Sequence, residues 1–319
     1  MVQALRASQL RPSSATSLRA PMTSSSVLAS TMASPLVSHS KLVSMPSTWS
    51  VSLCHHHFPP KTFQTGAGTT ASRLGTADLG IATQLDMKNN AEMLANIDPS
   101  IPLISDADSG YGGPIMVART VEQYARAGVA GMHIEDQVQT KRCGHLGGKE
   151  LVDLETYSAR IRAAVAARKR VGSDIVIIAR TDSLQSYGYD EAIRRLKTVR
   201  DLGADVGFLE GMTSVEMFKK ACADLAPWPM LLNMVEGGIT PTVSKKEAKE
   251  CGFRLIIHPF AAIAPAYGAI YDGMLKLKTT GRMDHDPKLT PQFIFKVCGL
   301  DDSMAIDKEA GGQAFKVEP

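Results

Sequence analysis

The sequence lacks any apolar run of about 18 or more residues, so no segment is suited to cross a membrane as a helix. It also has little cysteine. The five cysteines are an odd number without C-x-x-C spacing, which argues against a disulfide framework and against a structural zinc site. A reducing compartment therefore suits the chain best.

Acidic residues are absent from the first 60 positions, which hold four basic residues and many serines and alanines. This composition is typical of a mitochondrial transit peptide, but a disordered tail without a targeting role shares it. The predicted location is therefore mitochondrial or cytoplasmic. Without those four bases, 31 basic residues face 32 acidic ones. This near-neutral balance provides no basic surface of the kind that binds nucleic acid or a membrane, and it indicates small-molecule partners.

From about Thr62 onward, short β-branched runs alternate with stretches of helical periodicity, the pattern of repeated βα units. Strands are expected at 61–65, 102–106, 131–135, 175–179, 206–209, 230–233 and 254–257, and helices at 117–127, 154–170, 189–202, 214–225 and 245–251. We predict an α/β fold of the (β/α)8 TIM-barrel type. The expected units are a disordered or transit-like segment (1–60), the catalytic barrel (61–281) and a C-terminal helical arm (282–319).

A closed barrel of this type needs eight strands, and the first one is hard to find. Residues 48–54 are a weak strand candidate, but the gap to Thr62 is too short for a crossover of at least about ten residues. Either the first βα unit is degenerate or missing, or the N-terminal segment is an altered version of it. A barrel without this unit cannot close in the usual way.

Polar side chains follow the expected strands at the point where each strand ends. They are Asp106 and Asp108, Glu135 and Asp136, Arg180 and Asp182, Glu210, Asn233 and Glu236, and His258. In a parallel barrel these strand ends converge on one face, where barrel active sites lie. Loops are polar in general, but this many polar strand ends together predict a shared site.

Asp106 and Asp108 form a hard-oxygen cluster with Glu135 that suits Mg²⁺, with Mn²⁺ as an alternative. The glycine-rich run at 110–113 allows the backbone to approach a ligand there. A D-x-D pair alone can be an ordinary surface or cap pair. We expect a metal ion that holds a substrate carboxylate and stabilises a developing enolate.

Residues 141–145 place Cys143 between cationic residues and a histidine. Nearby positive charge should lower the pKa of the Cys143 thiol and favour a thiolate that transfers protons. The usual alternative is a buried packing cysteine, and Cys222 and Cys251, which lie on helical patterns, fit that description.

Arg180, at a strand end, could clamp a substrate carboxylate through two parallel hydrogen bonds, or pair internally with Asp182 or Glu210. The turn at 65–68 offers a hydroxyl and backbone N–H groups for a second carboxylate. A short glycine-rich turn is a weak signal by itself.

Seven ordered motifs resemble those of isocitrate lyases and methylisocitrate lyases, within the isocitrate lyase and phosphoenolpyruvate mutase superfamily. The most specific is K-R-C-G-H at 141–145, which follows G-M-H-I-E-D-Q at 131–137. The others are T-G-A-G at 65–68 with A-S at 71–72, D-L-G at 78–80, D-A-D-S-G-Y-G at 106–112, A-R-T-D at 179–182, and N-M-V-E-G-G at 233–238 with T-P at 240–241. The resemblance covers about residues 62 to 281, some two thirds of the chain.

The resemblance implies a magnesium-dependent carbon–carbon lyase acting on a small 2-oxo or 2-hydroxy di- or tricarboxylate. It implies that Asp106 binds the metal directly, and that the ion is held through water by Asp78, Asp108 and Glu135. Cys143 would be the acid/base. The remaining implied site residues are Lys141, His145 and Glu210, which serve catalysis and order the closing loop, and Thr65, Gly66, Ala67, Arg180, Asn233 and Thr240, which hold substrate.

The same resemblance implies a homo-oligomer, usually a tetramer, whose last barrel helix is swapped between subunits. Cys143 favours the lyase branch over the phosphonate mutases, and residues 236–241 look more like broad-specificity plant and fungal members. Methylisocitrate, dimethylmalate-like acids and oxaloacetate, the last by hydrolysis, stay open as substrates. A catalytically degenerate barrel is the alternative from another class. Two departures from the family pattern are an unrecognisable first strand and Phe63 where tyrosine is common.

Overall fold

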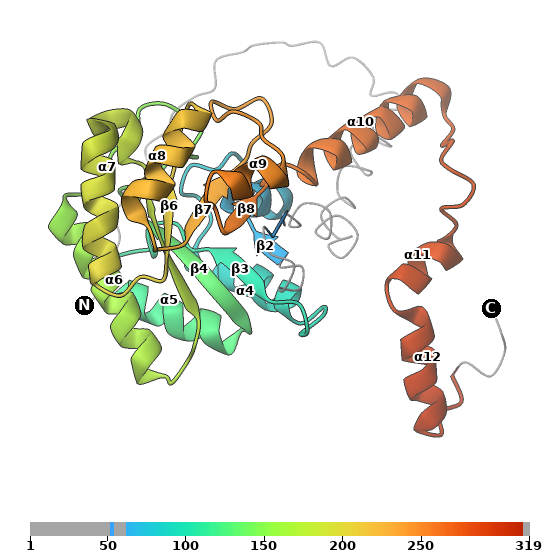
Figure 1. Cartoon of the computed structure of the whole chain (residues 1–319). Coiled ribbons are helices and arrows are strands. Elements are labelled where there is room, and N and C mark those ends of the chain that lie inside the picture. Colours follow the sequence, from blue (N-terminus) through green and yellow to red (C-terminus); the bar gives the residue numbers. More distant parts are fainter. Residues whose placement is uncertain (1–51, 54–61, 315–319) are drawn as a thin grey trace, which may run out of the picture.

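The computed structural model of the chain describes residues 52–53 and 62–314 and contains a barrel-shaped parallel sheet (Figure 1). Its parallel strands are β2 (Thr62–Gln64), β3 (Leu103–Asp106), β4 (Val129–Glu135), β5 (Val176–Thr181), β6 (Val206–Leu209), β7 (Met230–Asn233) and β8 (Leu255–Ile257). Each pairs in parallel with the next along the chain. The predicted α/β TIM-type fold is confirmed, and every predicted strand is found within about two residues of its expected bounds.

Helices connect the strands and cover the outer face of the sheet (Figure 1). They are α3 (Gly66–Thr69), the π-helical η2 (Thr70–Leu74), α4 (Gln84–Ala95), α5 (Pro114–Arg126), α6 (Leu154–Arg170), α7 (Ser183–Asp201), α8 (Val215–Leu225) and α9 (Lys245–Glu250). Three further helices follow β8: α10 (Ile263–Thr280), α11 (Pro291–Val297) and α12 (Leu300–Glu309). Helices α5 to α9 are the five that the sequence predicts.

The barrel is nearly closed, and its first unit is altered as the sequence suggested. Strand β1 (Ser52–Leu53) pairs antiparallel with β8, with Ser52 opposite Ile256. It therefore occupies the edge of β8 where a parallel first strand would pair. In residues 52–53 and 62–314, no parallel strand bridges β2 and β8. The rest of the predicted N-terminal segment, including its suspected targeting role, lies outside the described residues.

Helices α4 and α7 differ from what periodicity predicts, and α10 was also not among the expected helices. Helix α4 was not expected, because its buried face includes the polar residues Gln84 and Asn90, which weaken the apolar pattern. A capping box between Thr83 and Asp86 starts it. Helix α7 begins earlier than predicted because two helical segments join across Gly188, whose φ of 82° interrupts the helix.

The buried residues form two apolar clusters on opposite faces of the sheet. The larger lies between the strands and the helices, and the smaller fills the barrel interior. The interior cluster consists of Phe63, Ile104, Ile178, Val206, Phe208, Leu231 and Ile257. Because side chains alternate along a strand, the residues two positions later also point inward, toward the carboxyl ends. The interior cluster is therefore the floor beneath the site.

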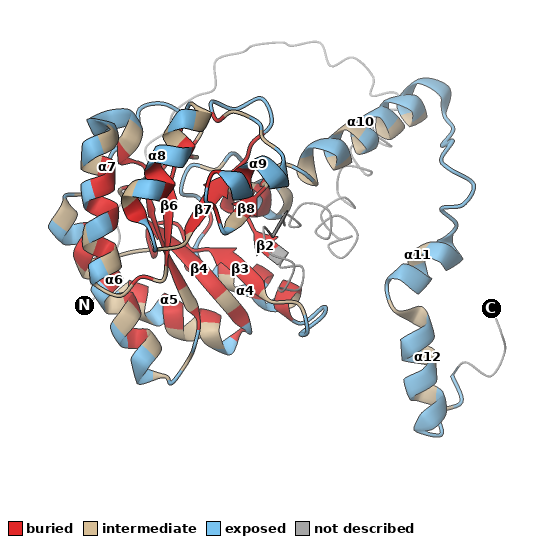
Figure 2. Ribbon diagram, viewed as in Figure 1, coloured by how far each residue is buried: buried red, intermediate tan, exposed pale blue. Residues whose placement is uncertain are grey.

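Helices α10, α11 and α12 lead away from the barrel and have no buried residue (Figures 1 and 2). The C-terminal helical arm expected at 282–319 contains α11 and α12. Among the described residues, no helix has both the length and the apolar character that a bilayer span requires.

Candidate active site

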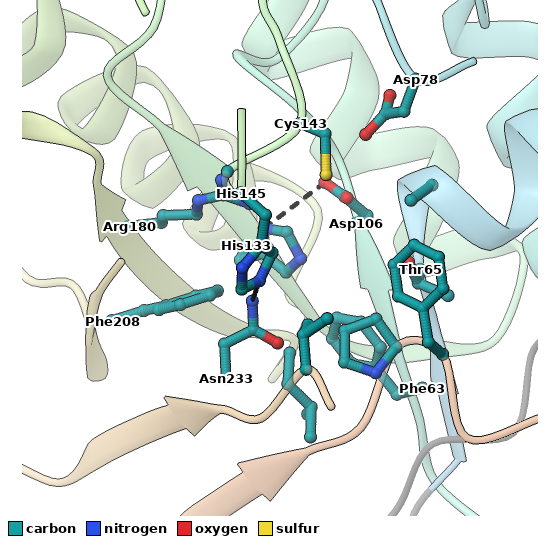
Figure 3. A pocket seen from close by; sticks show the side chains of 16 residues that line it. Phe63, Thr65, Asp78, Asp106, His133, Cys143, His145, Arg180, Phe208 and Asn233 are labelled. Atoms are coloured by element: carbon teal, nitrogen blue, oxygen red, sulfur yellow. Dashed lines mark hydrogen bonds and ion pairs between the residues drawn. The ribbon is translucent and has the colours of Figure 1, made fainter. Parts of the chain in front are cut away.

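A cavity opens at the carboxyl ends of the strands, on the face where the polar strand ends were expected to meet (Figure 3). The predicted site residues that line it are Thr65, Ala67, Asp78, Asp106, Cys143, His145, Arg180 and Asn233. They come from the ends of three strands, β3, β5 and β7, and from the segments that follow β2 and β4. The strand alternation explains this gathering, since Asp106, Arg180 and Asn233 each stand two residues after a member of the interior cluster.

Asp106 ends β3 and lies at the centre of the predicted metal cluster. Its Oδ2 accepts the N–H of Gly66 at 2.9 Å, and its Oδ1 accepts the N–H of Asp108 at 2.9 Å. A Cβ at position 66 would lie 2.4 Å from Oδ2, so only glycine allows this approach. Burial raises the pKa of Asp106, but positive charges, including those of Lys141 and Arg180, lower it overall. Asp106 is therefore an ionised carboxylate.

Lys141 bridges two of the other predicted metal carboxylates. Its buried Nζ lies 2.7 Å from Oδ1 of Asp78 and 2.5 Å from Oδ1 of Asp108. Burial raises the pKa of Asp108 to about 7; Lys141 opposes this rise, and Asp106 and Asp78 add to it. The φ of Asp108 is 45°, in the left-handed region that non-glycine residues rarely adopt. This loop is thus held in a strained shape around the carboxylates.

Glu135 completes the acidic cluster from the end of β4. Its Oε2 lies 3.2 Å from Nη1 of Arg180, and its Oε1 accepts a hydrogen bond from Nε2 of Gln137 at 2.9 Å. Burial raises the pKa of Glu135 well above its usual value, even though Arg180 opposes the shift. Burial thus disfavours the charged form of Glu135.

These residues fit a divalent cation of the kind that prefers oxygen ligands. Asp78, Asp106, Asp108 and Glu135 are hard oxygen donors, and burial raises the pKa values of Asp108 and Glu135, a shift that a bound cation would oppose. Across the described ranges, no three Asp, Glu, His or Cys side chains gather closely enough to bind an ion directly.

The predicted low pKa of Cys143 is wrong. Burial raises the pKa of the thiol, and nearby Asp78 raises it further, while Arg180 and Lys141 only partly offset this. The physical reason is where the neighbouring cations point. The ammonium of Lys141 contacts Asp78 and Asp108, and Nη1 of Arg142 donates to the carbonyl of Gly147 on the exposed side of the loop. Cys143 is therefore a protonated thiol facing the cavity (Figure 3).

Arg180 combines the two roles that the sequence left open. Its Nε and Nη2 donate to the two carboxylate oxygens of Asp182 at 2.8 and 3.0 Å, which is the internal pairing. The side chain nevertheless lines the cavity, and its guanidinium carbon lies 5.2 Å from the ring centre of Phe208. Internal pairing thus orients a guanidinium that still faces the space where a substrate would lie.

Asn233, Glu210 and His145 form a polar group beside Arg180, whose Nη2 lies 3.9 Å from Oε2 of Glu210. Nδ2 of Asn233 donates to Oε2 of Glu210 at 3.0 Å and lies 3.4 Å from Nε2 of His145. Burial lowers the pKa of His145, which Glu210 partly opposes. Thr240 is buried but does not line the cavity. Its predicted contact with substrate stays a prediction.

Three residues near the site were missed as functional candidates. His133 and Phe208 line the cavity from inside β4 and β6, each two residues before a predicted site carboxylate, which is the signal that could have found them. Lys149 lies in the loop after β4 and contacts Asp182 from 33 residues away in sequence. No local sequence pattern predicts that contact.

Comparison with known proteins yields matches over most of the chain. A family model described as phosphoenolpyruvate phosphomutase matches residues 34–277. The 2,3-dimethylmalate lyase of Eubacterium barkeri is 39% identical over 226 residues, which cover 70% of this chain and 77% of that protein.

Two solved structures are similar in both sequence and shape. A crystal structure of 2,3-dimethylmalate lyase has a TM-score of 0.80 and 55% identity, and the match covers 93% of this chain and 98% of that one. A structure of oxaloacetate acetylhydrolase with the inhibitor 3,3-difluorooxalacetate has a TM-score of 0.78 and 57% identity, over 79% of this chain and 86% of the other.

Proposed function

Since the chain belongs to the isocitrate lyase and phosphoenolpyruvate mutase superfamily and is a carbon–carbon lyase, we propose that it cleaves a small 2-hydroxy or 2-oxo dicarboxylate or tricarboxylate. The observation that carries this proposal is the shared cavity of a protonated thiol, a guanidinium, an amide and an ionised carboxylate, on Cys143, Arg180, Asn233 and Asp106. A dimethylmalate-like or methylisocitrate-like acid is the favoured substrate class.

Substrate binding would depend on donors that surround the cavity. Arg180, held by Asp182, would bind one carboxylate, and Asn233 would donate to the same group or its neighbour. Thr65 and Ala67 line the other side, at the start of α3, where backbone N–H groups favour a second carboxylate. Two separated carboxylate positions suit a diacid better than a monoacid.

A metal ion, Mg²⁺ or Mn²⁺, would be held directly by Asp106 and through water by Asp78, Asp108 and Glu135. When bound, it would supply positive charge that stabilises an oxyanion developing on the substrate. All four side chains offer the hard oxygen ligands that such an ion prefers, which supports the assignment. Lys141, which contacts Asp78 and Asp108, would hold the catalytic loop against the same carboxylates.

Cys143 would act as the proton donor. Cleavage leaves an electron pair on a carbon of the departing fragment, and that carbon needs a proton. A thiol whose pKa is raised by burial keeps its proton until a strong base forms beside it. His145 and Glu210, which lie next to Asn233, would order the closed loop around the reacting bond.

Oxaloacetate hydrolysis is a second candidate, supported by the 57% identity to an oxaloacetate acetylhydrolase. The two reactions differ in their products. Full-length protein should be incubated with 2,3-dimethylmalate, 2-methylisocitrate and oxaloacetate, and the products separated by chromatography. Pyruvate from either of the first two acids, lost with EDTA and restored by Mg²⁺, is the expected result. Oxalate and acetate from oxaloacetate would instead identify the hydrolase.

A folded protein that converts none of these acids would contradict both enzymatic readings and support a degenerate barrel. The control is circular dichroism of the same sample, which separates an inactive fold from an unfolded chain.

We also propose a homo-oligomer in which α10 packs on a second copy, as in a tetramer with a swapped helix. Helix α10 exposes Tyr267, Tyr271 and Leu275 at helical spacing, with side chains 68%, 55% and 46% exposed. An apolar face of this kind on a helix without buried residues favours a partner surface. Light scattering after size-exclusion chromatography would test this, and Tyr271→Glu should shift the protein toward smaller assemblies.

A further inference from the structure

Lys149 is a buried lysine that the proposed chemistry does not use. It lies in the loop between β4 and α6, its side chain is 1% exposed, and it does not line the cavity. Its Nζ donates to the backbone carbonyl of Gly144 at 2.7 Å and to Oδ1 of Asp182 at 2.9 Å. A buried ammonium group is costly without such partners, so both contacts are required where it lies.

The first contact holds the loop that carries Cys143. Gly144 follows Cys143 directly, and a Cβ at position 144 would lie 2.6 Å from Nη2 of Arg180 and 2.8 Å from Cδ of Glu210. The loop therefore packs tightly on the substrate-facing wall. On its other side, the N–H of Cys143 donates to the carbonyl of Asp78 at 3.1 Å. The bond from Lys149 fixes the loop between these two contacts.

The second contact holds the anchor of Arg180. Oδ1 of Asp182 accepts hydrogen bonds from both Lys149 and Nη2 of Arg180, and Oδ2 accepts one from Nε of Arg180. Burial would raise the pKa of Asp182, but Arg180 and Lys149 lower it to about 2. Asp182 is therefore a carboxylate at neutral pH, and Lys149 fixes it in place beside Arg180.

We propose that Lys149 is a positioning residue that couples the closed position of the Cys143 loop to the orientation of Arg180. One ammonium group contacts the loop that carries the proton donor and the carboxylate that orients the substrate-binding guanidinium. Opening the loop removes the Gly144 contact and leaves Lys149 with Asp182 alone. The catalytic part of this inference rests on the proposed function, while the coupling itself does not.

The test compares full-length protein with Lys149→Met, which keeps most of the length of the side chain but removes its charge and donors. The readout is the rate at which iodoacetamide alkylates Cys143, followed by mass spectrometry of the peptide that contains it. This rate needs no substrate, so it tests the coupling even if no acid is cleaved. We expect the rate to rise about tenfold, because the loop opens more often.

Where an acid is cleaved, Lys149→Met should lower kcat about 100-fold and change KM less, because the proton donor is misplaced. Val199→Ala is the matched control, since Val199 is fully buried in the outer core, away from the cavity. It should lower the thermal midpoint without accelerating alkylation of Cys143. A general loss of stability would accelerate alkylation in both variants and would overturn the proposal.

Lys149→Arg keeps the positive charge beside Asp182. It is a second variant that can be measured if Lys149→Met does not fold. The larger planar guanidinium cannot reproduce both contacts, so alkylation should be about threefold faster than in the unmodified chain. An unchanged alkylation rate in the folded Lys149 variants would overturn the proposed coupling.

Discussion

The barrel interior contains two layers of side chains from the same strands, and they differ sharply in chemistry. The lower layer is the apolar interior cluster, with residues such as Ile178 and Leu231. The layer two residues later holds Asp106, Glu135, Arg180, Glu210 and Asn233. Both layers are buried, yet one excludes charge and the other concentrates it. The alternation of a strand thus lets a single segment supply packing at one position and chemistry two positions later.

His133 is the exception that links the two layers. It occupies the lower layer, stacks on Phe63 with ring centres 5.5 Å apart, and meets Phe208 edge-on at 5.6 Å. Its Nδ1 lies 3.4 Å from Oδ1 of Asp106 in the upper layer. The imidazole therefore packs as an aromatic ring while one nitrogen faces the predicted metal ligand.

The largest expected effect comes from the catalytic loop above the upper layer. Cys143→Ser replaces the thiol with a hydroxyl of similar shape that is a much weaker acid. We expect kcat/KM to fall about 1,000-fold, roughly 4 kcal/mol in transition-state stabilisation, with little change in the denaturation midpoint. Steady-state kinetics and urea unfolding of the same preparation would measure both. Full activity in Cys143→Ser would remove the proposed proton donor.

The lower layer should show the opposite behaviour. Leu231 is 0% exposed and stands two residues before Asn233 on β7. Leu231→Ala should lower the free energy of unfolding by about 3 to 4 kcal/mol through lost burial and a cavity. The activity of the remaining folded protein should change only a few fold. Asn233→Ala is the matched control, and it should reduce activity more than stability; the reverse pattern would contradict the division between layers.

The pH dependence of stability should reveal the titration of His133. Burial lowers its pKa from 6.5 to about 4, against the opposing effect of Asp106. The unfolded chain therefore binds a proton at higher pH than the folded chain does. Stability contributed by neutral His133 is complete above pH 6.5 and is lost as the pH falls from 6.5 to 4, by about 3 kcal/mol.

Urea unfolding between pH 8 and pH 4, in buffer with EDTA, measures this loss. His133→Phe keeps the aromatic stacking and removes the titration, so its stability should fall less over the same interval. Parallel pH profiles for the two proteins would show that another group is responsible.

The sequence predicted the fold well because the signals for strands and helices are local. Apolar runs gave β6 and β7 with the observed bounds, and periodicity gave α6 in the same way. Helix α4 was not predicted, because polar residues such as Gln84 and Asn90 lie on its buried face. Three of the polar strand ends, Asp106, Arg180 and Asn233, line the cavity as expected, since their convergence follows from parallel topology.

Electrostatics could not be predicted in this way, because it depends on where side chains point. Lys141 and Arg142 directly precede Cys143, but Lys141 contacts Asp78 and Asp108, and Arg142 contacts the carbonyl of Gly147. The contact from Lys149 to Asp182 joins residues on different βα units. Neither arrangement has a signature in residue spacing.

The smallest expected effect concerns the ionisation of Cys143 and tests that distinction directly. Because burial raises its pKa above 9.0, the rate of alkylation by iodoacetamide should still be climbing at pH 9. A thiolate stabilised by neighbouring cations would instead give a rate that levels off near neutral pH. Subtracting the rate of Cys143→Ser at each pH removes the contribution of the other cysteines. A plateau below pH 8 would mean that the loop places its cations around the sulfur after all, and that the thiol is no longer a proton donor at rest.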